Sequence, residues 1–243
     1  MTSREVIVLI GGTSSLAQAL VNQYLSKKKL VKIIVAAKSQ EKYDNLYGTH
    51  PLEDIEFYKL DILNFNDIEN LIMYVKGCGR KATFFYLAAI KSINSKNIEN
   101  LFKINFLSSV YFYDCLLKKI DSFNFILIGS QGDIHGTYDT SSYNASKAAM
   151  SNYFEPIALS NKGTQQVFVI KPWLFQSKII TSSQLTNLLT YSPEYIAEVS
   201  IKKIAQGKSL IYIPAFTYKL VELLSFINKK LLYAIVLRFF KRK

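Results

Sequence analysis

The sequence predicts an α/β fold: a single domain with a doubly wound, mainly parallel sheet of seven strands and helices on both faces. Two observations lead to this prediction. Seven short apolar segments alternate with amphipathic segments along most of the 243 residues. The apolar segments are rich in β-branched and aromatic residues at consecutive positions, which is typical of strands buried on both faces. Such alternation favours parallel strands joined by right-handed crossovers.

The expected elements follow one another without an internal repeat, a low-complexity tract or a linker. The expected strands are 6–10, 32–36, 56–60, 83–87, 123–128, 166–170 and 210–213. The expected helices are about 16–28, 66–76, 98–119, 143–161 and 193–206. Ser192 and Pro193 suit the N-cap and the first turn of the last helix. Because ligands bind such a sheet at the carboxyl ends of its strands, motifs at those positions are the candidates for function.

Composition narrows the class of protein. Hydrophobic residues make up 49% of the chain and charged residues 20%, which is typical of globular domains and excludes a disordered or polytopic membrane protein. Cys78 and Cys115 lie far apart in segments expected to be helical, so we expect free thiols in a reducing cytoplasm. The N-terminus lacks the apolar core and cleavage site of a signal peptide, which also favours a cytoplasmic location.

A glycine turn follows the first expected strand and leads into a helix, with the sequence Gly-Gly-Thr-Ser-Ser-Leu-Ala at 11–17. Such a turn exposes backbone N–H groups and the positive end of the helix dipole to a pyrophosphate. Ser15 and Ala17 occupy the second and third glycine positions of the usual dinucleotide fingerprint, and both are small. The alternative interpretation is an ordinary turn with a helix cap. The turn residues expected to bind the dinucleotide are Gly11, Thr13, Ser14, Ser15 and Leu16.

The ends of the second and third expected strands predict which dinucleotide is bound. Sites for NAD usually place an acidic residue after the second strand, whereas this chain has Ala37, Lys38 and Ser39. The small side chain of Ala37 leaves room for a 2′-phosphate, which Lys38 and Ser39 could bind. These residues therefore favour NADP(H) over NAD(H). Alternatively, Lys38 is one more surface lysine. After the third strand, Asp61 and Ile62 are placed to contact an adenine ring.

Ser130, Tyr143 and Lys147 follow the fifth expected strand, and together they suggest the chemistry of carbonyl reduction. Reduction of a carbonyl needs a hydride donor and an acid that protonates the developing alkoxide. Tyr143 could be that acid, although the pKa of a free tyrosine, about 10, is too high for easy proton exchange at neutral pH. Lys147 lies one helical turn later, where its ammonium would lower the pKa of Tyr143 and could hold a nicotinamide ribose. Ser130 follows the strand and could polarise the substrate carbonyl.

On these motifs the chain resembles the short-chain dehydrogenase/reductase family over essentially residues 4–215, which implies a single-domain Rossmann-type fold. The resemblance implies that Ser130, Tyr143 and Lys147 are the catalytic residues. It adds Asn105, which would hold a water that links the lysine to solvent as a proton relay. The alternative for Asn105 is an amide on a helix surface.

Other family motifs are altered in this chain, which places it in a divergent branch. The family's Asn-Asn-Ala-Gly motif after the fourth strand is reduced to Leu87, Ala88 and Ala89. The Pro-Gly pair after the sixth strand becomes Pro172-Trp173. The resemblance implies that Leu87, Ala88, Ala89, Tyr143, Lys147, Pro172 and Ser177 also contact the cofactor. Trp173 could stack on a sugar or the nicotinamide, or it could belong to the core.

The C-terminal region suggests a substrate class and a location in the cell. Its layout is loosely similar to that of reductases acting on nucleotide- or lipid-linked keto sugars, such as decaprenylphosphoryl-2-keto-pentose reductases. Of the net charge of +12, seven lysines and arginines fall within 219–243, against one acid, with apolar residues at helical spacing. Such a helix could bind the inner face of the cell membrane. Alternatively, it packs on the domain or on a partner subunit.

The sequence thus predicts a dinucleotide-binding domain at 1–215 and a basic amphipathic helix or tail at 216–243. We expect a reductase of carbonyl substrates, with keto sugars of cell-surface polysaccharide synthesis as the substrate class, that assembles as a homodimer or homotetramer. No metal site is expected, and no nucleic-acid partner, because no recognised binding module accompanies the basic tail. Two alternatives stay open: an NAD-dependent sugar epimerase or dehydratase, and a non-catalytic dinucleotide sensor.

Overall fold

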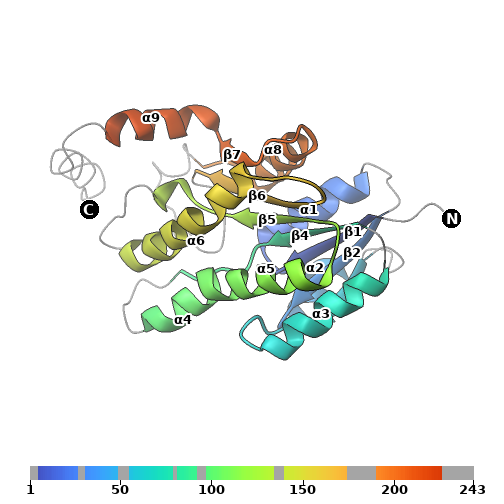
Figure 1. Cartoon of the computed structure of the whole chain (residues 1–243). Coiled ribbons are helices and arrows are strands. Elements are labelled where there is room, and N and C mark those ends of the chain that lie inside the picture. The colour runs from blue at the N-terminus through green and yellow to red at the C-terminus, as the bar shows by residue number, and fades with distance from the viewer. Residues whose placement is uncertain are drawn as a thin grey trace.

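The computed structural model describes residues 5–26, 31–48, 55–78, 81–91, 97–133, 140–173 and 190–225. Within these ranges the chain forms one seven-stranded sheet with helices on both sides (Figure 1). None of the helices in this part of the chain has the length and apolar character needed to cross a membrane.

All seven predicted strands are present, and every neighbouring pair is parallel. Their order in the sheet is β3-β2-β1-β4-β5-β6-β7. The strands are β1 (Glu5–Ile10), β2 (Val31–Ala37), β3 (Ile55–Lys59), β4 (Ala82–Tyr86), β5 (Phe123–Ile128), β6 (Gln165–Pro172) and β7 (Leu210–Ile213). The order changes direction between β1 and β4, and the loops after these two strands meet at that switch point. The predicted fold class is therefore confirmed.

The helices divide between the two faces of the sheet. One face is covered by α3 (Phe65–Cys78), α5 (Ser108–Lys119) and α6 (Ser141–Leu159). The other is covered by α1 (Ser15–Ser26), α2 (Gln40–Tyr47) and α8 (Pro193–Ala205). The remaining elements are α4 (Ile98–Phe102), the π-helical segment η2 (Lys103–Leu107), the short turn η3 (Gln131–Asp133) and α9 (Ala215–Ser225).

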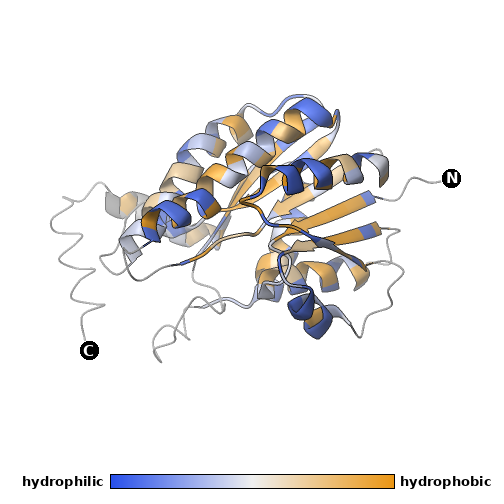
Figure 2. Cartoon of the chain, turned by 90° about the horizontal axis from the view of Figure 1, so that it is seen from below, coloured by the Kyte–Doolittle hydropathy of each residue, from blue (hydrophilic) through white to orange (hydrophobic). Residues whose placement is uncertain are grey.

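Strand β1 shows why consecutive apolar residues predicted doubly buried strands. Val6, Val8 and Ile10 pack on the α3–α5–α6 side, and Ile7 and Leu9 pack on the α1–α8 side, all fully buried. Figure 2 shows the strands coloured as hydrophobic along most of their length, whereas the helices are hydrophobic on only part of their surface. Two cores, one on each face, hold the sheet in place.

An aromatic cluster fixes α6 against the middle of the sheet. The rings of Phe112 and Phe125 stack with their centroids 5.9 Å apart, and Phe154 of α6 meets Phe125 edge-on at 5.9 Å. All three side chains are fully buried. Because the first two turns of α6 carry Tyr143 and Lys147, this packing sets the position of both side chains relative to the end of β5.

The C-terminal elements pack on the β6–β7 edge. Ser192 caps α8, as predicted, by accepting a 3.2 Å hydrogen bond from the N–H of Tyr195. The first turn of α9 contacts the rest of the domain through Thr217. This residue is buried and donates a 2.8 Å hydrogen bond to the side-chain oxygen of Gln131. Residues 226–243, which carry most of the predicted basic tail, lie outside the described residues.

Candidate active site

The glycine turn after β1 is built so that no larger residue fits. Gly11 has a φ of +77°, and a Cβ added there would lie 2.7 Å from the backbone nitrogen of Ala88. A Cβ on Gly12 would lie 2.7 Å from a methyl carbon of Val35. The turn therefore packs against the loop after β4 and keeps its backbone open toward the switch point, which suits the close approach of a pyrophosphate.

Ser14 of this turn is both a helix cap and a cavity-lining residue. Ser14 caps α1 by accepting a 3.2 Å hydrogen bond from the N–H of Ala17, and it also lines a cavity. Two predicted contacts are not brought to that cavity. Ser15 begins α1, and Leu16 is 4% exposed because this face of α1 packs into the core beneath the turn.

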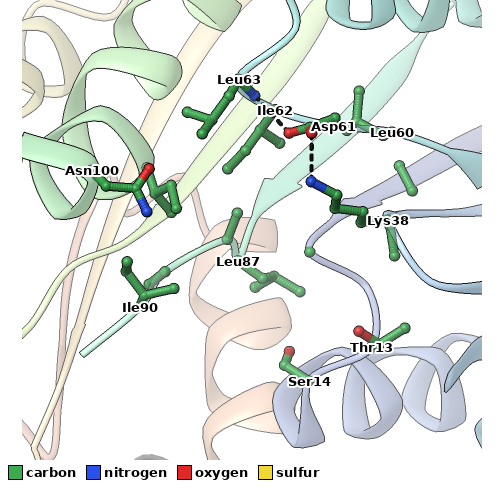
Figure 3. Close-up of a pocket in the computed structure, with 16 residues that line it drawn as sticks. Thr13, Ser14, Lys38, Leu60, Asp61, Ile62, Leu63, Leu87, Ile90 and Asn100 are labelled. Atoms are coloured by element: carbon green, nitrogen blue, oxygen red, sulfur yellow. Dashed lines mark hydrogen bonds and ion pairs between the residues drawn. The ribbon is translucent and has the colours of Figure 1, made fainter. Parts of the chain in front are cut away.

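The cavity lies at the carboxyl ends of β1, β2, β3 and β4, at the predicted binding position (Figure 3). Its volume is about 420 Å³, within the range of small-molecule sites. The predicted residues that line it are Gly11, Thr13, Ser14, Lys38, Asp61, Ile62, Leu87, Ala88 and Ala89. Lining residues not predicted as contacts are Ala36, Ala37, Leu60, Leu63, Ile90, Asn100 and Ile104.

Lys38 and Asp61 meet at the mouth of this cavity. The Nζ atom of Lys38 lies 2.7 Å from Oδ2 of Asp61, and Oδ1 of Asp61 accepts a 3.1 Å hydrogen bond from the N–H of Leu63 (Figure 3). Lys38 lowers the pKa of Asp61, and Asp61 raises the pKa of Lys38. Ser39 points elsewhere: its hydroxyl caps α2 by accepting from the N–H of Lys42 at 3.3 Å.

Tyr143 and Lys147 lie one turn apart on α6, as predicted. The Nζ atom of Lys147 lies 6.0 Å from the centroid of the Tyr143 ring. It donates a 2.8 Å hydrogen bond to the backbone carbonyl of Ile128, the last residue of β5. Lys147 is only 4% exposed, so its ammonium is held in a largely dry site at the end of the strand.

Burial shifts both groups away from their charged forms. It lowers the pKa of Lys147 to about 8, with the negative charge of Asp133 opposing this change. Burial, and to a lesser extent Asp133, raises the pKa of Tyr143 to about 12. The pKa of Tyr143 is therefore set upward by burial and Asp133, and the lowering expected from Lys147 is not seen in the protein alone.

Ser130 is presented by the turn after β5 and lies against the start of α6. Its hydroxyl oxygen accepts a 3.1 Å hydrogen bond from the N–H of Gly132. A Cβ added to Gly132 would lie 3.3 Å from this oxygen and 3.1 Å from Oδ1 of Asn144. The Ser130 hydroxyl and the Asn144 side chain are therefore close to each other. The structure thus brings the turn that carries Ser130 to the helix that carries Tyr143.

Asn105 links the helix that carries Tyr143 and Lys147 to the cavity. Its side chain is fully buried in η2, so the alternative of a surface amide is wrong. The amide binds both the N–H and the carbonyl of Ile90, at 2.8 and 2.9 Å, and donates to the hydroxyl of Ser146 at 3.0 Å. Because Ile90 lines the cavity and Ser146 precedes Lys147, Asn105 joins the two halves of the site.

Pro172, another predicted contact, is not part of the cavity lining. Pro172 is buried as the last residue of β6, paired with Ile213 of β7, and Trp173 directly after it is half-buried. Ser177 lies outside the described residues. Sequence reasoning missed Asp133, an acid three residues after Ser130 whose side chain is buried and whose charge acts on both Tyr143 and Lys147.

The parallel sheet, the glycine turn at its switch point and the Tyr143–Lys147 pair define a Rossmann-type dinucleotide-binding oxidoreductase. Residues 5–186 match the short chain dehydrogenase family, and the chain belongs to that family. A comparison with curated protein sequences finds no match.

Solved structures show the same fold at low sequence identity. A short-chain dehydrogenase from Streptomyces avermitilis is 18% identical, with a TM-score of 0.76 over 97% of this chain and 98% of that one. A short chain dehydrogenase from Burkholderia cenocepacia in complex with NADP is 14% identical, with a TM-score of 0.75 over 98% and 99% of the two chains. A relative from Burkholderia phymatum in complex with NAD is 15% identical, with a TM-score of 0.71 over 87% and 90%.

Proposed function

We propose that this protein reduces a carbonyl to an alcohol with NADPH, and that Tyr143 delivers the proton. The observation that carries the proposal is that Ser130, Tyr143 and Lys147 gather where β5 ends and α6 begins, and that Asn105 joins this region to Ile90 of the cavity wall. The complete set of four argues against a non-catalytic sensor, which has no need of a tyrosine and a buried lysine at this position.

The dinucleotide fits the residues present. Gly11 and Gly12 keep the turn free of side chains, the start of α1 faces the cavity, and the apolar walls suit an adenine ring. When bound, a reduced nicotinamide dinucleotide supplies a hydride to the carbonyl carbon.

The side chains of this protein supply the rest of the reaction. Ser130 donates a hydrogen bond to the carbonyl oxygen and polarises it. Tyr143 transfers its hydroxyl proton to that oxygen as the alcohol forms, which leaves a phenolate. Lys147 in its charged form stabilises the phenolate and holds the ribose next to the nicotinamide. Asn105 keeps the first turns of α6 in register with the cavity through Ser146, and supports the return of a proton to Tyr143 from solvent.

A preference for NADP(H) is supported by the end of β2, where Lys38 reaches the cavity mouth and no acid follows the strand. A 2′-phosphate would compete with Asp61 for the Lys38 ammonium. The measurement is the change in melting temperature with NADPH and with NADH. A larger rise with NADPH supports the preference, and a rise with NADH alone contradicts it.

The substrate class we propose is a keto sugar carried on a nucleotide or a polyprenyl phosphate. Half-buried Trp173, at the carboxyl end of β6, offers an aromatic face for a sugar ring. The protein would act in the cytoplasm as a homodimer or homotetramer, with its basic C-terminal segment at the inner face of the membrane. Light scattering tests the assembly, and co-sedimentation with anionic vesicles tests the membrane contact.

Oxidation of NADPH by nucleotide-linked keto sugars, followed at 340 nm, tests the reaction. Tyr143→Phe removes only the proton donor, so we expect turnover to fall by about 10²- to 10⁴-fold with NADPH binding retained. Near-normal turnover in this variant would contradict the mechanism. Purified protein that carries tightly bound NAD and does not oxidise NADPH would favour the sugar epimerase or dehydratase instead.

A further inference from the structure

A cluster of charged and polar side chains lies between the ends of β5 and β6 and the middle of α6. It consists of Asp133, Ser151, Glu155 and Lys171, and we refer to it as the Asp133 cluster. The Nζ atom of Lys171 lies 2.9 Å from Oδ2 of Asp133 and 2.6 Å from Oε1 of Glu155. Ser151 donates a hydrogen bond to the same oxygen of Asp133. The side chains of Asp133 and Lys171 are 2% and 5% exposed, so the pair is almost completely removed from water.

The cluster continues the catalytic face of α6. Tyr143, Lys147, Ser151 and Glu155 follow one another at intervals of four residues, so they lie along one side of the helix. Asp133 contacts this side at Ser151, one turn after Lys147. Its carboxylate is therefore placed next to the residues that carry out the proposed proton transfer.

Asp133 also closes the turn that presents Ser130. Its N–H donates a 3.3 Å hydrogen bond to the carbonyl of Ser130, while the N–H of Gly132 holds the Ser130 hydroxyl at 3.1 Å. A Cβ added to Gly129 would lie 3.2 Å from Cγ of Lys171 and 3.7 Å from the hydroxyl oxygen of Ser151. The end of β5 thus approaches the Asp133 cluster closely, and movement of the cluster would move Ser130.

Stability does not explain this arrangement. A buried ion pair usually contributes no more than apolar residues of the same volume, because desolvation offsets the attraction between the charges. Oδ1 of Asp133 is buried without a hydrogen-bond partner among the described residues, which adds a further cost. Burial raises the pKa of Asp133, although Lys171 and Ser151 oppose this rise, and the two acids together raise the pKa of Lys171.

We propose that Asp133 is a positioning residue: its carboxylate locks the turn that carries Ser130 against the face of α6 that carries Tyr143 and Lys147. The inference rests on the proposed function for its kinetic consequence, because a displaced Ser130 hydroxyl would no longer meet the carbonyl oxygen that Tyr143 protonates. Its structural consequence, a looser turn, is independent of any substrate.

Hydrogen exchange tests the structural consequence in the full-length protein. Asp133→Asn keeps the size of the side chain but removes its charge, so we expect amides within 129–133 to exchange roughly tenfold faster. Glu155→Gln is the matched control, since it removes the other acid that contacts Lys171 and should leave this exchange unchanged. Equal exchange in the wild type and Asp133→Asn would overturn the inference, as would equal acceleration in both variants.

Kinetics test the consequence for catalysis, with NADPH and uridine diphosphate 4-keto-6-deoxyglucose as the probes. We expect Asp133→Asn to lower kcat by roughly tenfold or more, with the KM for NADPH changed by less than about twofold. The double variant Asp133→Asn/Lys171→Met removes the ammonium that has lost its partner, and should recover melting temperature but not kcat. Recovery of both would show that Asp133 only balances Lys171, which would overturn the inference.

Two further variants separate this inference from the proposed function. If Ser130→Ala and Tyr143→Phe are slow and Asp133→Asn is not, positioning by Asp133 is wrong while the reductase mechanism stands. If Ser130→Ala and Tyr143→Phe turn over like the wild type, the proposed mechanism is wrong, and hydrogen exchange alone decides whether Asp133 holds the turn.

Discussion

Lys147 and Tyr143 share one face of α6, with the Lys147 nitrogen 6.0 Å from the Tyr143 ring centroid, and burial moves their pKa values in opposite directions. Lys147 has a pKa of about 8 and Tyr143 a pKa of about 12. Between these two values the phenol keeps its proton while the amine has lost its own. In the proposed reaction, proton donation by Tyr143 therefore depends on the charge of Lys147 at pH values where Tyr143 itself has not ionised.

The first prediction concerns the pH dependence of reduction. Asp133 and Tyr143 are the ionisable groups that we place near Lys147 among the described residues, and Asp133 favours its charged form. As pH rises through about 8, Lys147 becomes neutral and can no longer stabilise the phenolate left by proton transfer. We expect kcat/KM for reduction to fall by about tenfold per pH unit above that value. A profile that is flat to pH 10 would contradict this role.

The second prediction concerns stability. The pKa of Lys147 is lower in the folded chain than in the unfolded chain, so the unfolded chain binds more protons between about pH 8 and the ordinary lysine value. Wild-type stability should therefore gain up to about 3 kcal/mol from this group as pH rises through that window. Lys147→Met lacks this gain, so its melting temperature relative to the wild type should be higher at pH 6.5 than at pH 9.5. Exposed Lys42→Met is the control and should show no such difference.

The third prediction concerns the choice of dinucleotide. If Lys38 meets the 2′-phosphate, Lys38→Ala should weaken NADPH binding by about tenfold and leave NADH binding unchanged. Asp61→Asn releases Lys38 from its 2.7 Å ion pair and removes a charge that repels phosphate. It should tighten NADPH binding a few-fold, which corresponds to the small free energy that an exposed ion pair contributes. Titration calorimetry measures both constants, and parallel changes for the two dinucleotides would contradict a contact to the phosphate.

The fourth prediction concerns the glycine turn. Gly11→Ala places a methyl group 2.7 Å from the backbone of Ala88 at a φ of +77°, so we expect it to abolish the thermal shift with NADPH. Gly163→Ala is a matched control because Gly163 has a φ of +71° but nothing within 4 Å of an added Cβ. The control should lose about 1 kcal/mol of stability and keep dinucleotide binding. Equal loss of binding in both would mean that backbone strain, and not the turn itself, is responsible.

The sheet could be predicted because its strands are apolar at consecutive positions, a pattern that a strand buried on both faces must have. Helix α2 could not: it has only eight residues, and its two buried side chains, Tyr43 and Tyr47, are amphipathic tyrosines that give a weak apolar signal. The π-helical segment within the predicted helix 98–119 leaves no sequence pattern either, because it changes the hydrogen-bond register and not the residue types.

The candidate site was predictable where a motif follows its strand directly, as at Gly11 and Ser130. Asn100 and Ile104 line the cavity from a helical stretch that the sequence alone does not orient toward it. The pairing of Asp133 with Lys171 depends on β5 and β6 being neighbours in the sheet. The sequence predicts that Ser39 and Leu16 contact the cofactor. In the structure, Ser39 caps α2 and Leu16 packs in the core.

The hydrogen bond from Thr217 to Gln131 makes the first turn of α9 part of the support behind the turn that carries Ser130. A chain cut before this turn would leave the Gln131 carbonyl oxygen without its partner, in a place where water does not readily replace it. Removal of the chain from residue 216 onward would therefore also remove a contact that supports the domain. A truncation that tests the proposed membrane contact should keep α9 and begin at residue 226, so that damage to the domain is not mistaken for an effect on membrane binding.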